Sequence, residues 1–376
     1  MNRTLLPRIL PVSLLFLGLL TGCRSSTAPR IPEVLAHIAF DPGHPVEVAS
    51  NPRTGYVYIT NQGDHVGILN GTEQIAAVQT GGRRPNALAV DEERGWVYVV
   101  NEYADSVSVI RKTTVLTTLE TAGRNPQGVA VAPQSGWAYV VSGYSKSPPH
   151  GEIPVVAGNV TVISGTQIID VVLLGDMLTT RIAADPVSGN IYIGGGVGDA
   201  VTGITGRLVV VKDLNVIQQF DVEAPARAID ANSRTGDVYV LDVNANLLQV
   251  RGTEIVQRVN LWEESGSPRN MRVHPTTGDV YITYGCGLLV VRNMEVIGNL
   301  PIGCDGQKMV IDPLTGNVYV ANFSDNTVAV VQGTDLLATI DVGWYPYGIG
   351  VNPANGWVYV SNSNDSTVTI LGFSND

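Results

Sequence analysis

A four-residue phrase recurs along the chain and is the feature that most constrains its fold: glycine, a variable residue, an aliphatic residue or alanine, then tyrosine. It occurs eight times, and its tyrosines are Tyr58, Tyr98, Tyr139, Tyr192, Tyr239, Tyr281, Tyr319 and Tyr359. Successive tyrosines are 40, 41, 53, 47, 42, 38 and 40 residues apart. Self-similarity near 40 residues is typical of β-propellers, in which each repeat forms one four-stranded blade. The repeat therefore predicts an all-β fold, an eight-bladed β-propeller.

One repeat can be read strand by strand, and we letter its strands a to d in chain order. In the seventh copy, four short segments rich in Val and Ile are residues 307–311 (QKMVI), 317–322 (NVYVAN), 327–332 (TVAVVQ) and 335–342 (DLLATIDV). The segments between them, DPLTG, FSDN and GT, contain the residues that turns prefer. No long segment of the chain has the apolar period of a helix, and its 41 glycines and 21 prolines suit many turns.

The two ends of the repeat region predict how the ring closes. The eighth copy ends after its c strand, TVTILG, and lacks a d strand. Residues 33–45 (EVLAHIAFDPGHP) are similar to residues 335–346 (DLLATIDVGWYP), which form the d strand and following linker of the seventh copy. We therefore expect residues 34–40 to complete the last blade, which leaves no open sheet edge there.

The repeated phrases resemble the YVTN family of β-propellers, named for a Tyr-Val-Thr-Asn phrase. In this chain the phrase reads YITN at residues 58–61, YVVN at 98–101, YVAN at 319–322 and YVSN at 359–362, and the linker GGRRPNALAVD at 81–91 also matches. The resemblance covers residues 33–372 and implies the propeller architecture, without naming an activity. Propellers of this kind are often described with seven blades, so seven is the alternative count.

The first residues have the order of parts of an export signal. Arg3 and Arg8 precede an apolar run at residues 9–20, which is too short to span a bilayer, and LTGC follows at residues 20–23. This ending resembles a bacterial lipobox, which implies lipidation of Cys23; the alternative is an ordinary secretory signal. We predict a signal peptide at 1–22, a lipid-anchored tether at 23–32 and the propeller at 33–373. The protein would then be exported and anchored to the cell membrane or outer membrane, in the periplasm or at the cell surface.

The net charge argues against some partners. It is −11 for the whole chain, and removal of residues 1–22, with two arginines and no acid, makes it −13. A charge of this sign repels nucleic acid overall, so we expect none as a partner. The membrane is expected as a partner only through the lipid, and the protein is expected to be a monomer.

Two sets of residues recur at fixed positions relative to each repeat glycine. The repeated tyrosines are expected to pack against the neighbouring blade as scaffold. Nine residues before each glycine lies a mostly polar row, which we call the mouth row: Val46, Asn86, Gln127, Thr180, Arg227, Arg269, Gln307 and Tyr347. Because a strands line the channel of a propeller, we expect this row to surround one mouth of it. It would bind a ligand, or else form a solvated rim.

The repeat is least regular in copies 3 to 6. Two of these copies carry insertions in the b–c loop, at residues 143–158 and 196–206. Arg181, Arg227, Arg269 and Lys308 lie in or next to the same arc, which favours an anionic ligand. The alternative is that these cations pair with local acids, namely Glu223, Glu263 and Asp305.

Cysteine usage predicts one crosslink and no metal site. Cys286 and Cys304 flank the c and d strands of copy 6, and antiparallel pairing brings their neighbourhoods together, so an exported protein would join them in a disulfide. No CxxC or Cys/His zinc pattern is present, and the glycine-rich residues 194–203 lack the Lys-Ser/Thr of a phosphate loop. We expect no metal and no cofactor.

Together these features favour a binding module, not an enzyme. The predicted ligand-binding residues are Asn86, Gln127, Arg181, Arg227, Arg269, Gln307, Lys308 and Tyr347. The candidate partners are an anionic small molecule, a glycan or an envelope protein, on the face that carries the two insertions. One alternative is a periplasmic hydrolase or lyase, similar to a lactonase, that uses His150 and Glu152. A second alternative is a structural scaffold of the cell envelope.

Overall fold

A computed structural model describes residues 30–373 of the chain, apart from 146–155 and 200–202. From Ile31 onward the chain forms one compact unit. The expected signal peptide, the lipidation site Cys23 and most of the tether lie outside the described residues, so they stay predictions. No helix in the described part is long and apolar enough to cross a membrane.

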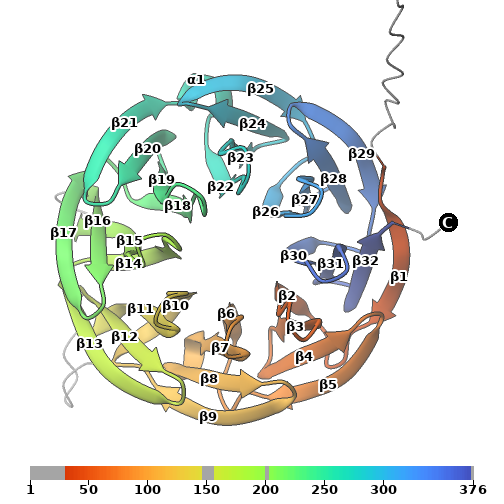
Figure 1. Cartoon of the computed structure of the whole chain (residues 1–376), viewed down its shortest axis with the longest axis horizontal. Coiled ribbons are helices and arrows are strands. Elements are labelled where there is room, and N and C mark those ends of the chain that lie inside the picture. Colours follow the sequence, from red (N-terminus) through yellow and green to blue (C-terminus); the bar gives the residue numbers. More distant parts are fainter. Residues whose placement is uncertain (1–29, 146–155, 200–202, 374–376) are drawn as a thin grey trace, which may run out of the picture. The chain divides into compact units, whose positions relative to one another are not determined.

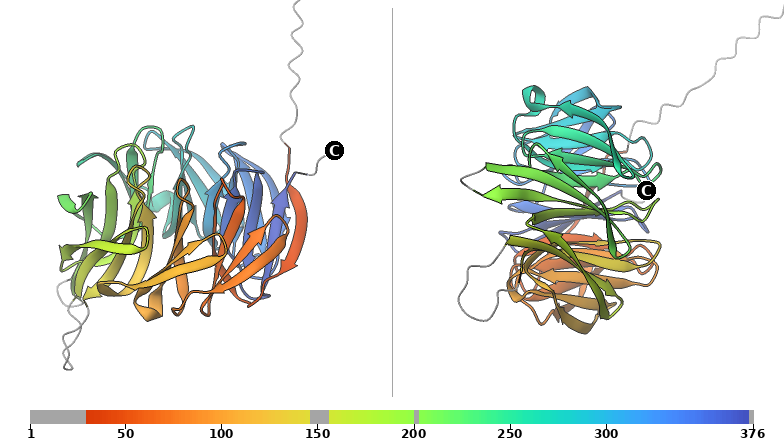
Figure 2. Two further views of the ribbon diagram at one scale, coloured as in Figure 1. Left: turned by 60° about the horizontal axis from the view of Figure 1, so that its bottom comes forward. Right: turned by 90° about the vertical axis from the view of Figure 1, so that its left-hand side faces the viewer.

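Eight antiparallel four-stranded sheets stand side by side around a central channel (Figure 1). This confirms the eight-bladed β-propeller and excludes the seven-bladed alternative. Blades 1 to 7 each take four consecutive strands, and blade 8 has the order β1-β32-β31-β30. The side views of Figure 2 show the blades arranged around the channel with their strands running between its two faces.

The strands form concentric layers around the channel, with the a strands innermost (Figure 1). The a strands are β2 (Pro45–Ser50), β6 (Pro85–Asp91), β10 (Gly123–Val131), β14 (Leu178–Ala184), β18 (Ala226–Ala231), β22 (Pro268–Val273), β26 (Gly306–Ile311) and β30 (Pro346–Asn352). The b strands are β3 (Tyr56–Asn61), β7 (Trp96–Asn101), β11 (Trp137–Ser145), β15 (Ile191–Asp199), β19 (Asp237–Asp242), β23 (Val280–Tyr284), β27 (Val318–Asn322) and β31 (Trp357–Asn362). The c strands are β4 (His65–Asn70), β8 (Ser106–Arg111), β12 (Val156–Ser164), β16 (Gly203–Lys212), β20 (Asn246–Arg251), β24 (Gly287–Arg292), β28 (Thr327–Gln332) and β32 (Thr367–Gly372).

The outermost layer follows the same order around the ring. The d strands are β5 (Glu73–Gln79), β9 (Thr114–Glu120), β13 (Gln167–Gly175), β17 (Asn215–Val222), β21 (Glu254–Asn260), β25 (Glu295–Pro301), β29 (Asp335–Asp341) and β1 (Glu33–Ala39). Two single turns of helix complete the described elements, η1 (Glu102–Ala104) and α1 (Trp262–Ser265). The b and c strands are almost wholly buried, whereas the d strands alternate between exposed and half-buried residues.

The repeated tyrosines pack between blades, as the sequence predicts. All eight are buried, with at most 7% of the residue exposed. Four of their hydroxyl groups donate to a carbonyl oxygen in the c–d turn of the next blade: Tyr139 to Asp213, Tyr192 to Gly252, Tyr281 to Gly333 and Tyr359 to Gly71. Each tyrosine thus contributes apolar surface to the core between two blades and, in these four cases, a hydrogen bond across the junction.

The eighth blade is closed by the N-terminal strand, as expected. Strand β1 pairs antiparallel with β32, from Glu33 opposite Gly372 to Ala39 opposite Thr367. Phe40 follows β1 and is 3% exposed. Its ring lies against Gly67 of blade 1, where an added Cβ would lie 2.3 Å from a ring carbon. Glycine at position 67 therefore makes room for the aromatic ring that ends the closing strand.

The two insertions differ from the expected loops, because the described parts are largely strand. In blade 4 the b and c strands pair as far as Asp199 opposite Gly203. Glycines permit this, since an added Cβ at Gly195 would lie 2.1 Å from the carbonyl oxygen of Leu178. In blade 3 the pairing reaches Tyr144 opposite Val156. The insertions therefore lengthen two adjacent hairpins, and Figure 2 shows the green strands of blade 4 extending beyond their neighbours.

The disulfide between Cys286 and Cys304 is confirmed. It joins the b–c turn of blade 6 to the linker that leads into blade 7. In blade 7 an asparagine at the end of the b strand ties its turn to the preceding linker, because Asn322 Nδ2 donates to the carbonyl oxygen of Ile302 at 2.6 Å. Blade 6 has Tyr284 at the corresponding position. The crosslink therefore secures a turn whose repeat asparagine is missing.

Candidate functional site

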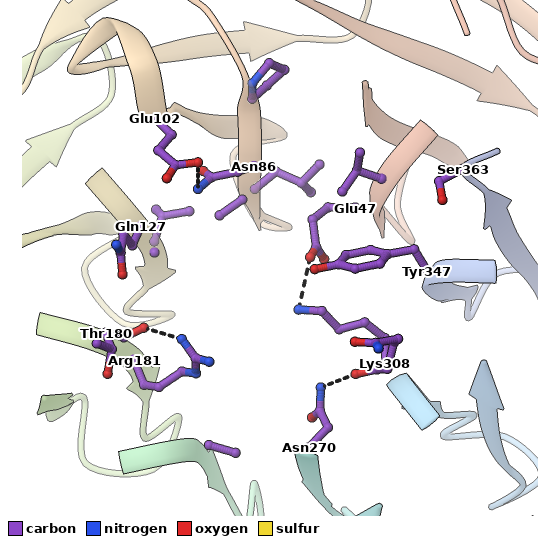
Figure 3. Close-up of a pocket in the computed structure, with 18 of the residues that line it drawn as sticks. Glu47, Asn86, Glu102, Gln127, Thr180, Arg181, Asn270, Lys308, Tyr347 and Ser363 are labelled. Carbon is purple, nitrogen blue, oxygen red and sulfur yellow. Dashed lines mark hydrogen bonds and ion pairs between the residues drawn. The ribbon is translucent and has the colours of Figure 1, made fainter. Parts of the chain in front are cut away.

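The central channel widens into a cavity of about 1280 Å³ on one face of the ring, which we call the channel cavity. Its wall is made by the first residues of the a strands, and its rim by linkers and b–c turns. The lengthened hairpins of blades 3 and 4 are b–c hairpins, so they stand on this same face. Figure 3 shows polar side chains pointing into the cavity from several blades.

A β-bulge in every a strand shapes the wall. In six blades the register between the a and b strands shifts across one residue, and that residue is the mouth-row residue. In blades 1 and 8 the shift covers the mouth-row residue and its successor. A bulge sets two residues opposite one and re-aims their side chains. Consequently all eight mouth-row residues, and seven of the eight residues that follow them, line the cavity.

The repeat phrase itself supports the bulge. The bulge frees a backbone N–H that the ladder no longer pairs, and a hydroxyl residue near the end of the b strand accepts it. The N–H of Glu47 donates to Thr60 Oγ1 at 3.1 Å, and that of Asn270 donates to Thr283 Oγ1 at 3.1 Å. In blade 8 the N–H of Gly348 donates to Ser361 Oγ at 2.8 Å. The Ser or Thr of these phrases therefore stabilises the backbone that presents the site.

The cavity is strongly cationic within an acidic protein. Six basic side chains line it, namely Arg84, Arg181, Arg227, Arg269, Arg272 and Lys308, against two carboxylates, Glu47 and Glu102. The lining residues alone have a balance of +4 (6 − 2). The acids Asp305 and Asp230, which pair with Arg269 and Arg272, reduce it to +2 (6 − 4), whereas the whole chain has a net charge of −11. A concave site of one sign concentrates ligands of the opposite sign.

Four of these cations have acidic partners. Arg269 pairs with Asp305 at 2.5 Å, and Lys308 of blade 7 pairs with Glu47 of blade 1 at 3.0 Å. Arg84 lies 3.4 Å from Glu102, and Arg272 lies 3.5 Å from Asp230. Burial raises the pKa of the Asp230 carboxyl, and Arg272 opposes that shift. Pairing with local acids therefore holds for part of the arc.

The expected acid partners are only partly correct. Asp305 pairs with a predicted cation, but Glu223 pairs with Arg258 on the surface instead. Glu263 lies in the short helix α1, and no ion pair joins it to the cavity cations within the described residues. Local acids therefore neutralise only part of the positive charge of the arc, which is less than the alternative of complete pairing with local acids predicts.

Of the six cavity cations, Arg181 and Arg227 have no carboxylate within ion-pair distance among the described residues. Arg181 is held by carbonyl groups, since its Nε donates to Arg227 O at 2.7 Å and its Nη1 to Thr180 O at 2.8 Å. Partial burial, and the like charge of Arg227, lower the pKa of the Arg181 guanidinium. Arg227 Nε is buried and has no hydrogen-bond partner. A bound anion would relieve both the repulsion and the missing hydrogen bond.

Amide side chains lie beside these two arginines. Asn86 Nδ2 donates to Glu102 Oε2 at 3.2 Å, whereas Asn86 Oδ1 is buried without a partner. Gln127 lies in blade 3, between Asn86 of blade 2 and Arg181 of blade 4, and no side-chain hydrogen bond joins it to other described residues (Figure 3). The wall of blades 2 to 5 thus presents an acceptor, an amide and two guanidinium groups in order.

Aromatic side chains line two parts of the rim, one at blades 7 and 8 and one at the b–c turn of blade 2. The rings of Phe323 and Tyr345 stack with centroids 4.7 Å apart. The guanidinium of Arg84 lies over the Tyr103 ring, 4.7 Å from its centroid. Figure 3 shows Tyr347 and Lys308 reaching into the cavity from the side opposite Arg181. These rings give the rim flat apolar faces among its charges.

The structure brings together all eight residues predicted to bind a ligand: Asn86, Gln127, Arg181, Arg227, Arg269, Gln307, Lys308 and Tyr347. His150 and Glu152, the pair of the hydrolase alternative, lie outside the described residues. His44 and Glu47 have separate partners: His44 Nδ1 contacts the carbonyl oxygen of Ser363 at 3.0 Å, and Glu47 binds Lys308.

Sequence reasoning missed several cavity residues, among them Glu47, Asn270 and Glu102. Glu47 and Asn270 directly follow mouth-row residues, so strict alternation would place them on the other face of the strand. The recurrent register shift at this position is what turns them inward. Glu102 belongs to the b–c turn of blade 2 and carries no repeat signal. No cluster of three or more His, Cys, Asp or Glu residues able to hold a metal occurs in the described ranges.

Comparison with known proteins agrees with the architecture. No family model matches the chain, and a search of curated proteins finds no match. Among solved structures, the chain is similar to hydrazine synthase of Kuenenia stuttgartiensis, with 16% identity and a TM-score of 0.58, over 91% of this chain and 99% of that chain. At this identity the likeness shows the fold alone. The chain is therefore a β-propeller.

Proposed function

We propose that this protein is an exported, lipid-anchored binding module whose channel cavity holds an anionic ligand against Arg181 and Arg227. The observation that supports this most directly is the pair of adjacent guanidinium groups without a carboxylate partner in the described chain. Leaving a buried donor unpaired costs about 1–3 kcal/mol, and more for a charged group, so such a pair is expected where a ligand completes it. The propeller would belong to the YVTN type that its repeat phrases resemble.

The anion site is tested by binding measurements on the purified full-length protein. Calorimetric titration with a panel of carboxylates, phosphates and acidic sugars should find a ligand. For that ligand, Arg181→Gln and Arg227→Gln should each weaken binding about 10- to 100-fold, because each removes a charge-assisted hydrogen bond of about 1.5–3 kcal/mol. Arg258→Gln is the matched control, since Arg258 lies in blade 5 on the surface and pairs with Glu223. Equal affinity in all three variants would refute the site.

The anchor is tested separately. Replacement of Cys23 by Ser should move the protein from the membrane fraction to the soluble extracytoplasmic fraction and abolish incorporation of labelled fatty acid. The physical reason is that the thioether-linked lipid supplies the membrane affinity, while the acidic propeller supplies none of its own. A protein that remains in the membrane fraction after this change would contradict the proposed anchor.

A further inference from the structure

We infer that the ligand of the channel cavity is a polyhydroxylated carboxylate, that is, a sugar acid, either free or at the end of an acidic polysaccharide. This inference rests on the proposed function, because it uses the same cavity and the same two arginines. It adds the chemistry that the ligand must carry besides its negative charge.

Two buried polar atoms of the wall define what the ligand must supply. Of the buried side-chain atoms without a partner in the described structure, those on cavity-lining residues are Arg227 Nε and Asn86 Oδ1. The first is a donor and requires an acceptor. The second is an acceptor and requires a donor. A fully ionised anion such as a simple dicarboxylate satisfies the first and leaves the second unpaired.

The orientation of Asn86 is fixed by its neighbour. Its Nδ2 donates to Glu102 Oε2, an atom that accepts only, so Oδ1 must be the atom that faces away from Glu102. An ammonium group would also donate to Oδ1. However, Glu102 is already paired with Arg84, and the cavity has an excess of positive charge, so a cationic group is repelled there. A hydroxyl group supplies the donor without that repulsion.

The order of groups around the wall matches such a ligand. Gln127, between Asn86 and Arg181, has a free amide that both donates and accepts, which is the pairing that a second hydroxyl group prefers. The ligand would therefore run from hydroxyl groups at blades 2 and 3 to a carboxylate at blades 4 and 5. Across the cavity, Tyr347 and the Phe323–Tyr345 stack offer apolar faces to the C–H face of a sugar ring.

The size of the cavity favours more than one sugar unit. Its volume of about 1280 Å³ exceeds the roughly 300–1,000 Å³ typical of pockets for drug-sized molecules. A short chain of acidic sugars with bridging water would fill it better than a single unit. We therefore expect oligomers to bind more tightly than the monomer.

The test compares ligands that differ in one chemical feature, on the purified full-length protein. Galacturonate and oligogalacturonate carry both carboxylate and hydroxyl groups, galactose lacks the carboxylate, adipate lacks the hydroxyl groups, and 6-aminohexanoate replaces them with an ammonium group. We expect galacturonate to bind at least tenfold more tightly than each of the last three. If oligogalacturonate binds and galacturonate does not, the natural ligand is the end of a polysaccharide. If galacturonate binds as tightly as oligogalacturonate, the natural ligand is the free sugar acid.

Variants separate failure of this inference from failure of the proposed function. Asn86→Leu and Gln127→Met remove the amide groups at similar volume, and each should weaken galacturonate binding about tenfold while leaving adipate binding unchanged. Gln127→Met keeps the test valid if Asn86→Leu lowers the melting temperature. If adipate binds as well as galacturonate, and both variants bind like the wild type, the sugar-acid inference is overturned while the anion site stands. If Arg227→Gln also has no effect on any anion, the proposed function fails as well.

Discussion

The repeated tyrosine hydroxyl groups show how one side-chain atom can join two sheets. Tyr192 of blade 4 donates to the carbonyl oxygen of Gly252 in blade 5 at 2.7 Å, while the ring is completely buried. The corresponding residue of blade 5, Tyr239, is also buried, and no hydrogen bond of its hydroxyl joins it to other described residues. The tyrosine hydroxyl group at this repeat position therefore contributes differently to the free energy of unfolding in blades 4 and 5.

This difference predicts unequal effects of removing the hydroxyl group. Tyr192→Phe should lower the free energy of unfolding by about 1 kcal/mol, because it removes a hydrogen bond and leaves a carbonyl group unpaired. Tyr239→Phe should change it by less than about 0.5 kcal/mol. Chemical denaturation of the two variants checks this. Equal losses would show that the hydroxyl group contributes by something other than the junction hydrogen bond.

At the scale of elements, blade 6 has a covalent tie that the other blades lack in the described structure. Its b–c turn has no repeat asparagine, and the Cys286–Cys304 disulfide joins this turn to the linker that follows blade 6, whereas the asparagine of blade 7 bonds to the linker that precedes its own blade. The N–H of Cys304 also donates to Asp325 of blade 7 at 2.7 Å. The crosslink therefore holds the linker between two blades, on the face of the ring that carries the channel cavity.

Loss of this crosslink should destabilise the protein measurably. The double variant Cys286→Ser, Cys304→Ser should have a free energy of unfolding lower by about 3 kcal/mol, as chain entropy predicts for a loop of this length. Denaturant unfolding with and without dithiothreitol checks it. Reductant should lower the stability of the wild type to that of the variant and leave the variant unchanged; a wild type indifferent to reductant would contradict the prediction.

Much of this architecture, and part of the site, could be predicted from the sequence. The repeat glycine and tyrosine mark each a–b turn and b strand because only a few residue types suit those positions, and the similarity of residues 33–45 to a d strand predicts the closing strand. The Ser or Thr that accepts the bulge N–H occurs in only some repeats, so the pattern does not reveal that Glu47 and Asn270 turn inward. The glycine-rich insertion of blade 4 reads as a loop, since glycine usually weakens strands. In the folded chain, close approach of backbone to the Leu178 carbonyl requires glycine there.

At the scale of the whole molecule, the eight buried tyrosines make the ring sensitive to alkali. Burial raises the pKa of Tyr58, Tyr139 and Tyr281 to about 12. It also raises the pKa values of Tyr98, Tyr192, Tyr239, Tyr319 and Tyr359. The unfolded chain releases these protons near pH 10, whereas the folded ring retains them above that pH.

Stability should therefore fall as the pH rises above about 10. Between the unfolded and folded pKa values the native state binds more protons than the unfolded state, so each such tyrosine lowers the free energy of unfolding by up to about 1.4 kcal/mol per pH unit. The stabilisation is complete below pH 10 and is lost as the pH rises through the folded pKa values, which are about 12 for Tyr58, Tyr139 and Tyr281. Denaturant midpoints at pH 9, 10 and 11 measure this, with Tyr58→Phe expected to show a shallower fall. A midpoint independent of pH over this range would disprove the effect.

The pairing of β1 with β32 also sets an order of events for the nascent polypeptide. Val34 and Leu371 are partners although 337 residues separate them (371 − 34), so the first propeller strand to be synthesised waits for the last one. Joining distant segments has an entropy cost that grows only with the logarithm of their separation. The long separation therefore adds little to the free energy needed to close the ring. Until β32 has been synthesised, β1 has no partner strand, and its exposed edge can pair with strands of other chains. If the chain is exported before it folds, all of it is present when folding begins, and the edge of β1 is then unpaired only while the ring closes.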